Sequence, residues 1–468
     1  MIVMKFGGTS TQDAIAMKNV VKIVESRLSL KPVVVVSAIA QATNFLERAG
    51  KLASDGKSDD ALSTLQQLAD RHYGIIGVLI KDQGLNDNLN RIVESSFNEL
   101  RELIKGVSIL GELTPRALDS FYCYGELLSS RIVAAVLQER GIPSLWIDTK
   151  DFMVTDDNFN RAMPMMEIVE DKVMKVIKPV GENGIVPVTQ GFIGITSGGK
   201  RTTMGRESSD YSASIIGCAL TATDIQIWTD VDGVLTADPT VVETPKTVKV
   251  LSFEEAFELS YFGAKVLHPN TMLPAIEKNI PIHIYNSRKP NLSGTLVTKQ
   301  TNGKSVIPKS VAYKRNVIVM NIIPKRRFGK YLFWEHIHNV LNRYNIVSFA
   351  TVTSEYSYSI VIDDKNNIPA VIHDLEEVGK ITISENRSIV CLVGSNLRLS
   401  SNLVNRMFNT IPDIGIELIS FGASNSNLSF IVEDEKAHDV VRKIHKEFFG
   451  STLDDEYFEV LTHHQQKT

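Results

Sequence analysis

The chain has 468 residues, enough for two or three domains that each hold a core of their own. A hydrophobic content of 43% and a charged content of 22% are ordinary for a soluble globular protein, and a net charge of −4 excludes a global basic field for nucleic acid. The three cysteines are far apart, form no CxxC pair and indicate unpaired thiols in a reducing compartment.

Membrane and export segments are not expected. The longest apolar run, 32–40, is far shorter than the roughly 20 residues of a membrane helix, and the first expected strand begins at residue 2, where a signal peptide would lie. We therefore expect a cytoplasmic protein with no membrane and no nucleic-acid partner. A metal site formed by protein ligands is not expected either, because His336 and His338, at i and i+2, would point apart on a helix.

Strands and helices alternate over the first 290 residues. The β-branched run at 33–36 is typical of a strand buried on both faces of a mostly parallel sheet. This alternation implies right-handed crossovers, so we expect an α/β domain whose central sheet is sandwiched by helices. The expected strands are 2–6, 33–37, 144–148, 186–195, 225–229 and 280–285. The expected helices are 13–26, 43–54, 61–81, 89–105, 116–140, 166–176, 209–220, 253–262 and 273–278.

The C-terminal part repeats itself after a loop-rich segment at 286–310, in which one short strand is expected at 294–297. Residues 359–363 correspond to 429–433, an offset of roughly 70 positions, and each copy reads strand, helix, strand, strand, helix, strand. The pattern predicts two ferredoxin-like α+β modules, which either share a ligand site or serve only in dimerisation. The expected division is 1–290, a linker at 291–312, modules at 313–385 and 386–452, and a polar tail at 453–468.

The first ten residues predict an anion site. A short apolar strand ends in Lys5, and the Gly7-Gly8 turn and a hydroxylated helix start follow. Backbone N–H groups of such a turn and the helix dipole favour an anion. The lysine precedes the glycines, whereas in a Walker A loop it follows them, so a P-loop NTPase is excluded. The alternative is a plain strand, turn and helix, capped by a capping box at 10–13.

Two acidic residues and one arginine predict an amino-acid site. Arg206 can hold a carboxylate with two hydrogen bonds, and Asp210, in the first turn of the next helix, can accept from an ammonium group. Gly125, inside a long helix, allows close approach of a ligand or a neighbouring backbone and makes Glu126 a second candidate for the ammonium. The alternative for Arg206 and Asp210 is a surface ion pair beside a capped helix.

Two further motifs follow the strand at 225–229 and the helix at 253–262. The turn 228–233 lacks the spacing of an EF-hand and is expected to touch a nucleotide or Mg²⁺ at a strand end. Lys265 lies near a helix end before Pro269, where a lysine ordinarily interacts with the helix dipole.

Together these motifs resemble the aspartate kinases of the amino-acid-kinase superfamily. The matches occur in the family's order and span the first 290 residues, and the C-terminal repeats resemble that family's pair of ACT domains. The resemblance implies the amino-acid-kinase fold followed by two ferredoxin-like ACT modules. The matching segments are KFGGTS at 5–10, the 34–44 region, 125–126, 190–194, 202–210, 228–233 and 263–269.

The resemblance implies that ATP and L-aspartate give ADP and 4-phospho-L-aspartate, with Mg²⁺, at the entry to lysine, threonine and methionine biosynthesis. The residues agree, because a carboxylate nucleophile is already ionised at pH 7 and needs no general base. Catalysis then reduces to alignment and to neutralising charge on the phosphoryl group.

The resemblance also assigns roles to the matching positions. Lys5, Lys265 and Asp210 would form the catalytic group, with Lys5 as the leading charge stabiliser. Arg206 would hold the substrate α-carboxylate, and Glu126 and Asp210 would hold its ammonium. The expected ATP site comprises Lys5, Gly7, Gly8, Thr229, Asp230 and Lys265, and the expected substrate site comprises Thr43, Glu126, Arg206, Ser209 and Asp210.

Three departures from the family pattern affect these roles. Glu207 adds a negative charge beside Arg206, and Leu235 and Thr240 replace residues that contact the nucleotide in some members. In the regulatory region, Thr353, Ser354 and Glu355 match lysine-sensitive members. Phe349 stands where those members carry an aspartate on the lysine ligand. An apolar ring cannot pair with an ammonium group, so we expect weak or absent lysine inhibition, or a different amino-acid effector.

Two other functions compete with an aspartate kinase. The first is a kinase for another acceptor, such as glutamate or a nucleotide monophosphate, although an amino-acid site and ACT-like modules argue against a nucleotide. The second is a catalytically dead ACT-type amino-acid sensor, against which the retained lysines and acidic partners argue. A homodimer or a higher oligomer is expected from the ACT pair.

Overall fold

The computed structural model describes residues 1–205, 208–263, 269–299, 305–325, 329–363, 367–450 and 457–459. The chain divides into two compact units, one formed by Met1–Gly233 with Leu267–Lys299 and the other by Val234–Val266 with Gln300–Thr468. Within the described ranges, none of the helices combines the length and apolarity that crossing a membrane requires. The predicted domain boundaries at 290, 312, 385 and 452 stay predictions, and residues 234–266 group with the C-terminal unit.

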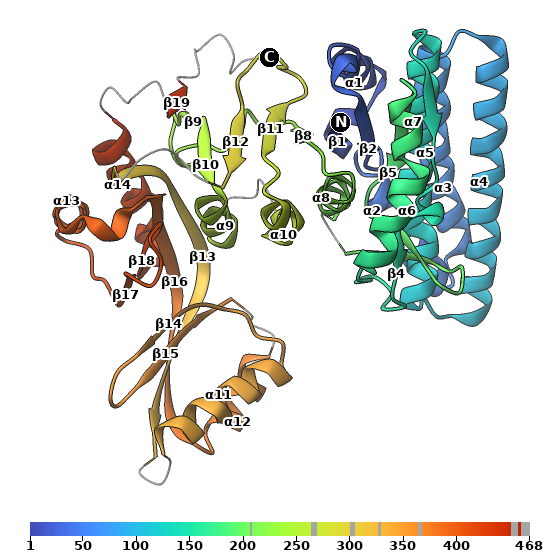
Figure 1. Ribbon diagram of the computed structural model, residues 1–468. Helices are drawn as coiled ribbons and strands as arrows, with labels where there is room; N and C mark the ends of the chain where they lie inside the picture. Colours follow the sequence, from blue (N-terminus) through green and yellow to red (C-terminus); the bar gives the residue numbers. More distant parts are fainter. Residues whose placement is uncertain are drawn as a thin grey trace. The chain divides into compact units, whose positions relative to one another are not determined.

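The first unit is built on a mostly parallel sheet, which confirms the predicted fold class (Figure 1). Its strands lie in the order β12-β11-β8-β1-β2-β5-β3, and of these neighbours only β11 and β12 run antiparallel. The strands are β1 (Ile2–Phe6), β2 (Pro32–Val36), β3 (Ser144–Trp146), β5 (Val186–Gln190), β8 (Asp224–Thr229), β11 (Ile282–Asn286) and β12 (Thr295–Thr298). A small separate sheet contains β4 (Val154–Thr155), β6 (Ile193–Thr196) and β7 (Arg201–Thr203).

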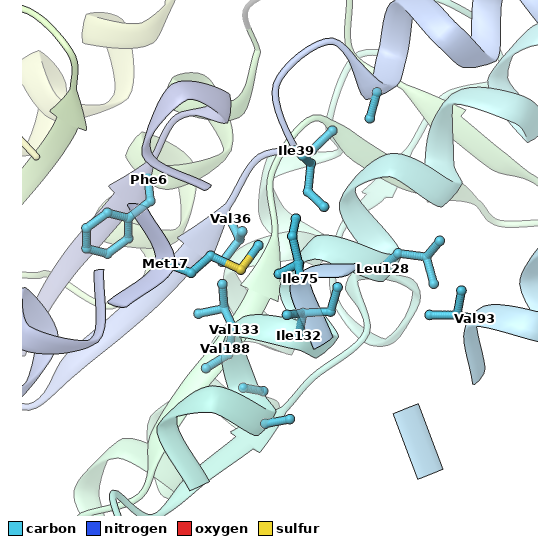
Figure 2. Packing of buried hydrophobic residues seen from close by; sticks show 14 of the residues in the cluster. Phe6, Met17, Val36, Ile39, Ile75, Val93, Leu128, Ile132, Val133 and Val188 are labelled. Carbon is cyan, nitrogen blue, oxygen red and sulfur yellow. The ribbon is translucent and has the colours of Figure 1, made fainter. Parts of the chain in front are cut away.

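Helices cover both faces of this sheet because both faces of its central strands are apolar. Every residue of β1 is buried, and alternate side chains point to opposite faces. Met4 and Phe6 join the cluster formed with α1 and α5, and Val3 lies against α8 at Gly217. Figure 2 shows Phe6, Met17, Val36, Ile132, Val133 and Val188 packed in that cluster.

The helices of the first unit agree with the predicted alternation. They are α1 (Ala14–Glu25), α2 (Ala42–Ser54), α3 (Ser58–Leu79), α4 (Gln83–Leu110), α5 (Pro115–Glu139), α6 (Met166–Val176), α7 (Lys178–Glu182), α8 (Ser209–Ala219) and α10 (Pro269–Lys278). Short 3-10 helices are η1 (Gly8–Thr11), η2 (Leu28–Leu30) and η3 (Thr149–Asp151).

The predicted capping box at 10–13 is wrong. The helix α1 begins at Ala14, and Asp13 is its N-cap, accepting from the backbone N–H of Ala16 at 2.8 Å. Ser10 lies in η1, and its hydroxyl donates to Ser287 Oγ at 2.8 Å. This hydroxyl therefore joins the turn to a distant loop instead of capping the helix.

The second unit contains a six-stranded antiparallel sheet in the order β14-β15-β13-β16-β18-β17. Its strands are β13 (Ile307–Pro324), β14 (Ser348–Thr353), β15 (Tyr358–Ile362), β16 (Gly379–Ser395), β17 (Leu418–Phe421) and β18 (Asn427–Glu433). Its helices are α9 (Phe253–Tyr261), α11 (Lys330–Arg343), α12 (Ile368–Leu375), α13 (Ser401–Thr410) and α14 (Ala437–Phe449). The shorter elements are β9 (Thr247–Val248), β10 (Val250–Ser252), β19 (Phe458–Glu459), η4 (Leu397–Leu399) and η5 (Asp434–Lys436).

The predicted repeat is visible in this sheet, since α11, β14, β15 and α12 correspond to α13, β17, β18 and α14. The long strands β13 and β16 run through both copies (Figure 1). The first half of β13 pairs with the second half of β16, with Ile307 opposite Ser395 and Lys314 opposite Ile389. Residues 307–312, expected to be linker, are therefore strand.

Candidate functional site

The Gly7-Gly8 turn lies at the edge where the parallel strands end. Gly7 N–H donates to the carbonyl of Trp228 at 3.1 Å, which ties the turn to β8. A Cβ on Gly8 would lie 3.0 Å from the carbonyl oxygen of Ala38, so the turn approaches the segment after β2 too closely for a side chain. The ends of β1, β2 and β8 thereby converge on one turn.

Lys5 and Asp210 come together at this edge. Lys5 is 9% exposed, and its Nζ lies 2.5 Å from Asp210 Oδ1, in the first turn of α8. The same Nζ would be 3.5 Å from a Cβ on Gly7, so the ammonium lies over the glycine turn. A cation is thus held beside backbone donors and a helix N-terminus, an arrangement suited to a phosphate.

Glu126 presents a buried, unsatisfied carboxyl group. The side chain is 3% exposed, Oε1 accepts from the N–H of Ala38 at 3.0 Å, and Oε2 has no hydrogen-bond partner among the described residues. Burial raises the pKa of Glu126 to about 8, and the N–H of Ala38 and the charge of Lys5 oppose this rise. The group is therefore largely neutral at pH 7 and would ionise when a cation binds beside it.

A cavity of about 450 Å³ brings Glu126 together with two further predicted substrate residues. Thr43 lies in the first turn of α2, and Ser209 is the first residue of α8. Gly191 makes room for Ser209, because a Cβ on Gly191 would lie 2.6 Å from the Cβ of Ser209. The lining residues are Thr43, Asn44, Glu47, Leu118, Tyr122, Glu126, Asn160, Phe192, Thr203, Gly205 and Ser209.

The close approach that Gly125 was expected to allow is to a neighbouring segment. A Cβ on Gly125 would lie 2.8 Å from the Cβ of Ala38, whose N–H holds Glu126. We expect Gly125→Ala to lower the melting temperature by an amount equivalent to about 1–3 kcal/mol, because overpacking must move α5 or the Ala38 segment. Gly74→Ala in α3, which meets no atom within 4 Å, is the matched control.

That control should stabilise the protein by roughly 0.5–1 kcal/mol through helix propensity. Thermal unfolding of both variants measures the contrast. Equal melting temperatures would show that the contact between Gly125 and Ala38 does not constrain this wall of the cavity.

The nucleotide-side residues lie at the end of β8. Thr229 is its last residue, and the exposed Asp230 follows. Asp232 in the same turn is bound by the side-chain amide of Asn286 and by Lys289 Nζ, the latter at 3.2 Å. The turn is therefore fastened to the end of β11. Within the described part of the chain, no three histidine, cysteine, aspartate or glutamate side chains are grouped to hold a metal ion.

Two predicted site residues, Arg206 and Lys265, lie outside the described residues. The predicted regulatory residues belong to the second unit. Phe349, in β14, has Lys314 Nζ 4.2 Å from its ring centroid and the Tyr261 ring 5.2 Å away. Thr353 ends β14, and Ser354 and Glu355 follow in the exposed turn before β15.

Sequence reasoning assigned no role to most of the cavity wall, including Asn160 and Thr203, or to Asp119 behind these two residues. Asn160 and Thr203 line the cavity, and the backbone N–H groups of both donate to buried Asp119 at 3.0 Å. No local pattern marks Asp119, because its partners lie 41 and 84 positions away in the sequence. A larger cavity of about 980 Å³, lined mainly by α4 and α5, contains none of the predicted site residues.

Comparisons with known proteins agree with this geometry. The amino acid kinase family profile matches residues 1–286, and an ACT domain profile matches residues 390–448. Aspartokinase 1 of Arabidopsis thaliana, a chloroplastic protein, is 34% identical over 96% of this chain and 80% of its own length. The lysine-sensitive aspartokinase 3 of Escherichia coli is 30% identical over 96% of this chain and 99% of its own.

Solved structures give the same result. The crystal structure of E. coli aspartokinase III with aspartate and ADP superposes with a TM-score of 0.83 at 31% identity, covering 96% of this chain and 100% of that one. The crystal structure of the same enzyme with lysine and aspartate superposes with a TM-score of 0.78 at 30% identity, covering 96% of this chain and 99% of that one. The predicted family, fold and kinase activity are thereby confirmed, and the chain belongs to the amino acid kinase family as an aspartokinase.

Proposed function

We propose that the chain transfers the γ-phosphoryl group of ATP to the β-carboxylate of L-aspartate, through the site around Lys5 and Glu126. The observation that carries this proposal is the buried Oε2 of Glu126, which lines the 450 Å³ cavity without a partner among the described residues. An unpaired buried carboxyl costs free energy unless a donor binds it, and an ammonium group is the donor that also restores its charge.

Substrate binding follows from the charges around the cavity. The α-ammonium of aspartate binds Glu126, with Asp210 as a second acceptor, and Arg206 binds the α-carboxylate. Thr43 and Ser209 lie at two helix N-termini, where N–H groups and the helix dipole favour a carboxylate. With both α-substituents bound, the β-carboxylate is left to attack.

Phosphoryl transfer requires orientation and charge neutralisation. Lys5 leaves its ion pair with Asp210 to bind the phosphoryl oxygens, and Gly7 and Gly8 offer backbone donors beside it. Lys265 contributes a second cation, and Thr229 and Asp230 bind the nucleotide. The attacking carboxylate oxygen forms a bond to the γ-phosphorus as the bond to the β–γ bridging oxygen breaks, so ADP takes up that electron pair.

Mg²⁺ fits this site as a companion of the nucleotide. Mg²⁺ is commonly held by substrate phosphates, waters and one or two carboxylates rather than by a cage of protein ligands. The exposed carboxylate of Asp230, at the strand end, is suited to that part. When bound, the ion would neutralise charge on the transferring phosphoryl group.

Trapping the product as a hydroxamate tests the proposal. The full-length chain is incubated with ATP, Mg²⁺ and hydroxylamine, with aspartate, with glutamate, or with no acceptor. We expect hydroxamate with aspartate and little with glutamate, since its longer chain places the carboxylate about one methylene too far from the phosphate. Signal with glutamate alone would instead support a kinase for another amino acid, and no signal with either would favour a catalytically inactive sensor.

Regulation by lysine is expected to be weak. The ring of Phe349 is already covered by the ammonium of Lys314, which also pairs with Asp363 at 2.6 Å. A second ammonium would meet the like charge of Lys314 there, and the carboxylate of Asp363 is already paired. We expect the lysine concentration for half-inhibition to exceed that of the E. coli lysine-sensitive relative, assayed alongside, by at least about tenfold.

Activity is titrated with lysine, threonine and methionine to measure this. The double variant Phe349→Asp with Lys314→Met should become more sensitive to lysine, and Lys314→Met alone is its control. Potent inhibition of the unaltered protein by lysine would contradict the expectation.

Three further properties are proposed from the resemblance to aspartokinases, namely the oligomeric state, the location and the metabolic role. A homodimer or higher oligomer formed through the ACT modules can be measured by light scattering. We also propose a cytoplasmic location and a role at the start of lysine, threonine and methionine synthesis.

A further inference from the structure

Asn160 contributes a second unsatisfied acceptor to the cavity that contains Glu126. Its Oδ1 is buried and has no hydrogen-bond partner within the described ranges, like Oε2 of Glu126, and both residues line the 450 Å³ cavity. Buried polar groups are rarely left unpaired in folded proteins. Once Glu126 is ionised, the cavity offers two unpaired acceptors, and these fit a ligand with several donors on one atom.

The backbone conformation of Asn160 is stabilised by hydrogen bonds from its loop to Asp119 and to β7. Its φ of 68° lies in the left-handed region, which most side chains disfavour. Its N–H donates to Asp119 Oδ2 at 3.0 Å. Two residues further on, Ala162 N–H donates to the carbonyl of Thr203 in β7 at 3.0 Å. The loop that carries Asn160 is therefore fixed to β7.

Asp119 is the centre of this support. It is fully buried and accepts three hydrogen bonds, from the N–H of Asn160, from the N–H of Thr203 and from the hydroxyl of Thr203. Leu118, Tyr122 and Glu126 lie at i, i+4 and i+8 on the α5 face that lines the cavity. Asp119 therefore ties the loop and β7 to the helix that carries Glu126.

We propose that Asn160 determines specificity for an α-amino acid by accepting a hydrogen bond from the substrate ammonium, and that Asp119 is the positioning residue that holds Asn160. This inference rests on the proposed function. An ammonium group has three N–H donors, and Glu126 Oε2 and Asn160 Oδ1 would accept two of them. A dicarboxylic acid without the amine would leave Asn160 Oδ1 unpaired and Glu126 protonated.

Asn160→Gly tests the contact, because glycine keeps the positive φ while removing the amide. On the full chain, we expect the KM for aspartate to rise roughly 10- to 100-fold, the loss of one hydrogen bond to a charged group, with the KM for ATP unchanged. Competitive inhibition by succinate, which lacks the ammonium, should change by less than about threefold. Equal weakening of aspartate and succinate, or no change in either, would overturn the proposal.

Two substitutions of Asp119 separate positioning from charge. In Asp119→Asn, the amide oxygen can accept both N–H groups and the amide nitrogen can donate to the Thr203 hydroxyl, so the KM for aspartate should stay within about threefold. Asp119→Leu should raise it at least about tenfold without changing the KM for ATP. An asparagine variant as impaired as the leucine variant would overturn the positioning role. Absence of aspartate-dependent ADP formation in the unaltered protein would instead overturn the proposed function.

Discussion

Lys5→Met should lower kcat by roughly 10³-fold, the scale expected for a charge-stabilising donor in the transition state. In the free protein, Lys5 Nζ lies over the Gly7 turn and pairs with Asp210 at 2.5 Å. Methionine keeps most of the buried volume but supplies no charge. The KM for aspartate should change much less than kcat, because Lys5 binds the transferring phosphoryl group and not the amino-acid end of the substrate.

Steady-state kinetics with full-length variants measure this split. Lys18→Met, at an exposed position of α1, is the matched control and should keep its kcat. Melting temperatures are recorded for both, since Lys5→Met leaves Asp210 without its ion pair. A kcat within tenfold of the unaltered protein, in a variant that melts normally, would remove Lys5 from the phosphate site.

Lys5→Arg refines the same test. Arginine keeps the positive charge, but its planar fork is bulkier than an ammonium group, and the Lys5 ammonium lies within about a van der Waals contact of the Gly7 position. We expect a kcat between those of the lysine and methionine proteins. This order would show that both the charge and its place over the glycine turn contribute.

The glycine-turn edge could be predicted because its signals are local. Apart from Lys5, the strands β1 and β2 are continuous apolar segments, which is the pattern of buried parallel strands. The carboxyl ends of parallel strands lie at the same edge of the sheet. A lysine at the end of such a strand therefore lies at the ligand edge, whatever the rest of the fold. The Gly125-Glu126 pair was likewise visible as a glycine in a helix, although its partner Ala38 was not.

The missed features depend on contacts between distant segments. Strand β13 begins at Ile307, but the charged Lys309 interrupts its apolar sequence pattern. The lysine can be buried in the strand because its ammonium pairs with Glu255 at 2.9 Å. The role of Ser10 depends on Ser287, 277 positions away. Asp119 reads as an ordinary helix residue until the fold brings Thr203 beside it. Hydrogen bonds and ion pairs of this kind leave no periodic signal in the sequence.

Glu126→Gln should abolish a proton release that accompanies aspartate binding. Burial raises the pKa of Glu126 to about 8, so the free protein holds this proton at pH 7. An ammonium group beside the carboxyl favours its ionised form, so binding expels close to one proton. Calorimetry at pH 7 in buffers of different ionisation enthalpy counts that proton. Glutamine cannot ionise, so the variant should release no proton. Its affinity for aspartate should be lower by roughly 10²-fold.

The same substitution should reverse a loss of stability at alkaline pH. The folded pKa of about 8 exceeds the ordinary value of 4.5, so the folded state holds the proton more tightly than the unfolded state. The stabilisation is fully present below about pH 4.5 and is lost as pH rises toward 8, by about 2–3 kcal/mol between pH 6 and 8.5. Glutamine has no such dependence.

We therefore expect Glu126→Gln to melt higher than the unaltered protein at pH 8.5, by about 2–4 °C per kcal/mol, and to lose about half of that advantage at pH 6. Glu102→Gln, at a side chain 70% exposed on α4, is the matched control and should follow the unaltered protein at both pH values. A melting difference for Glu126→Gln that is equal at pH 6 and 8.5 would mean that the carboxyl titrates normally. Glu126 would then already be ionised at pH 7 and would bind an ammonium group without releasing a proton.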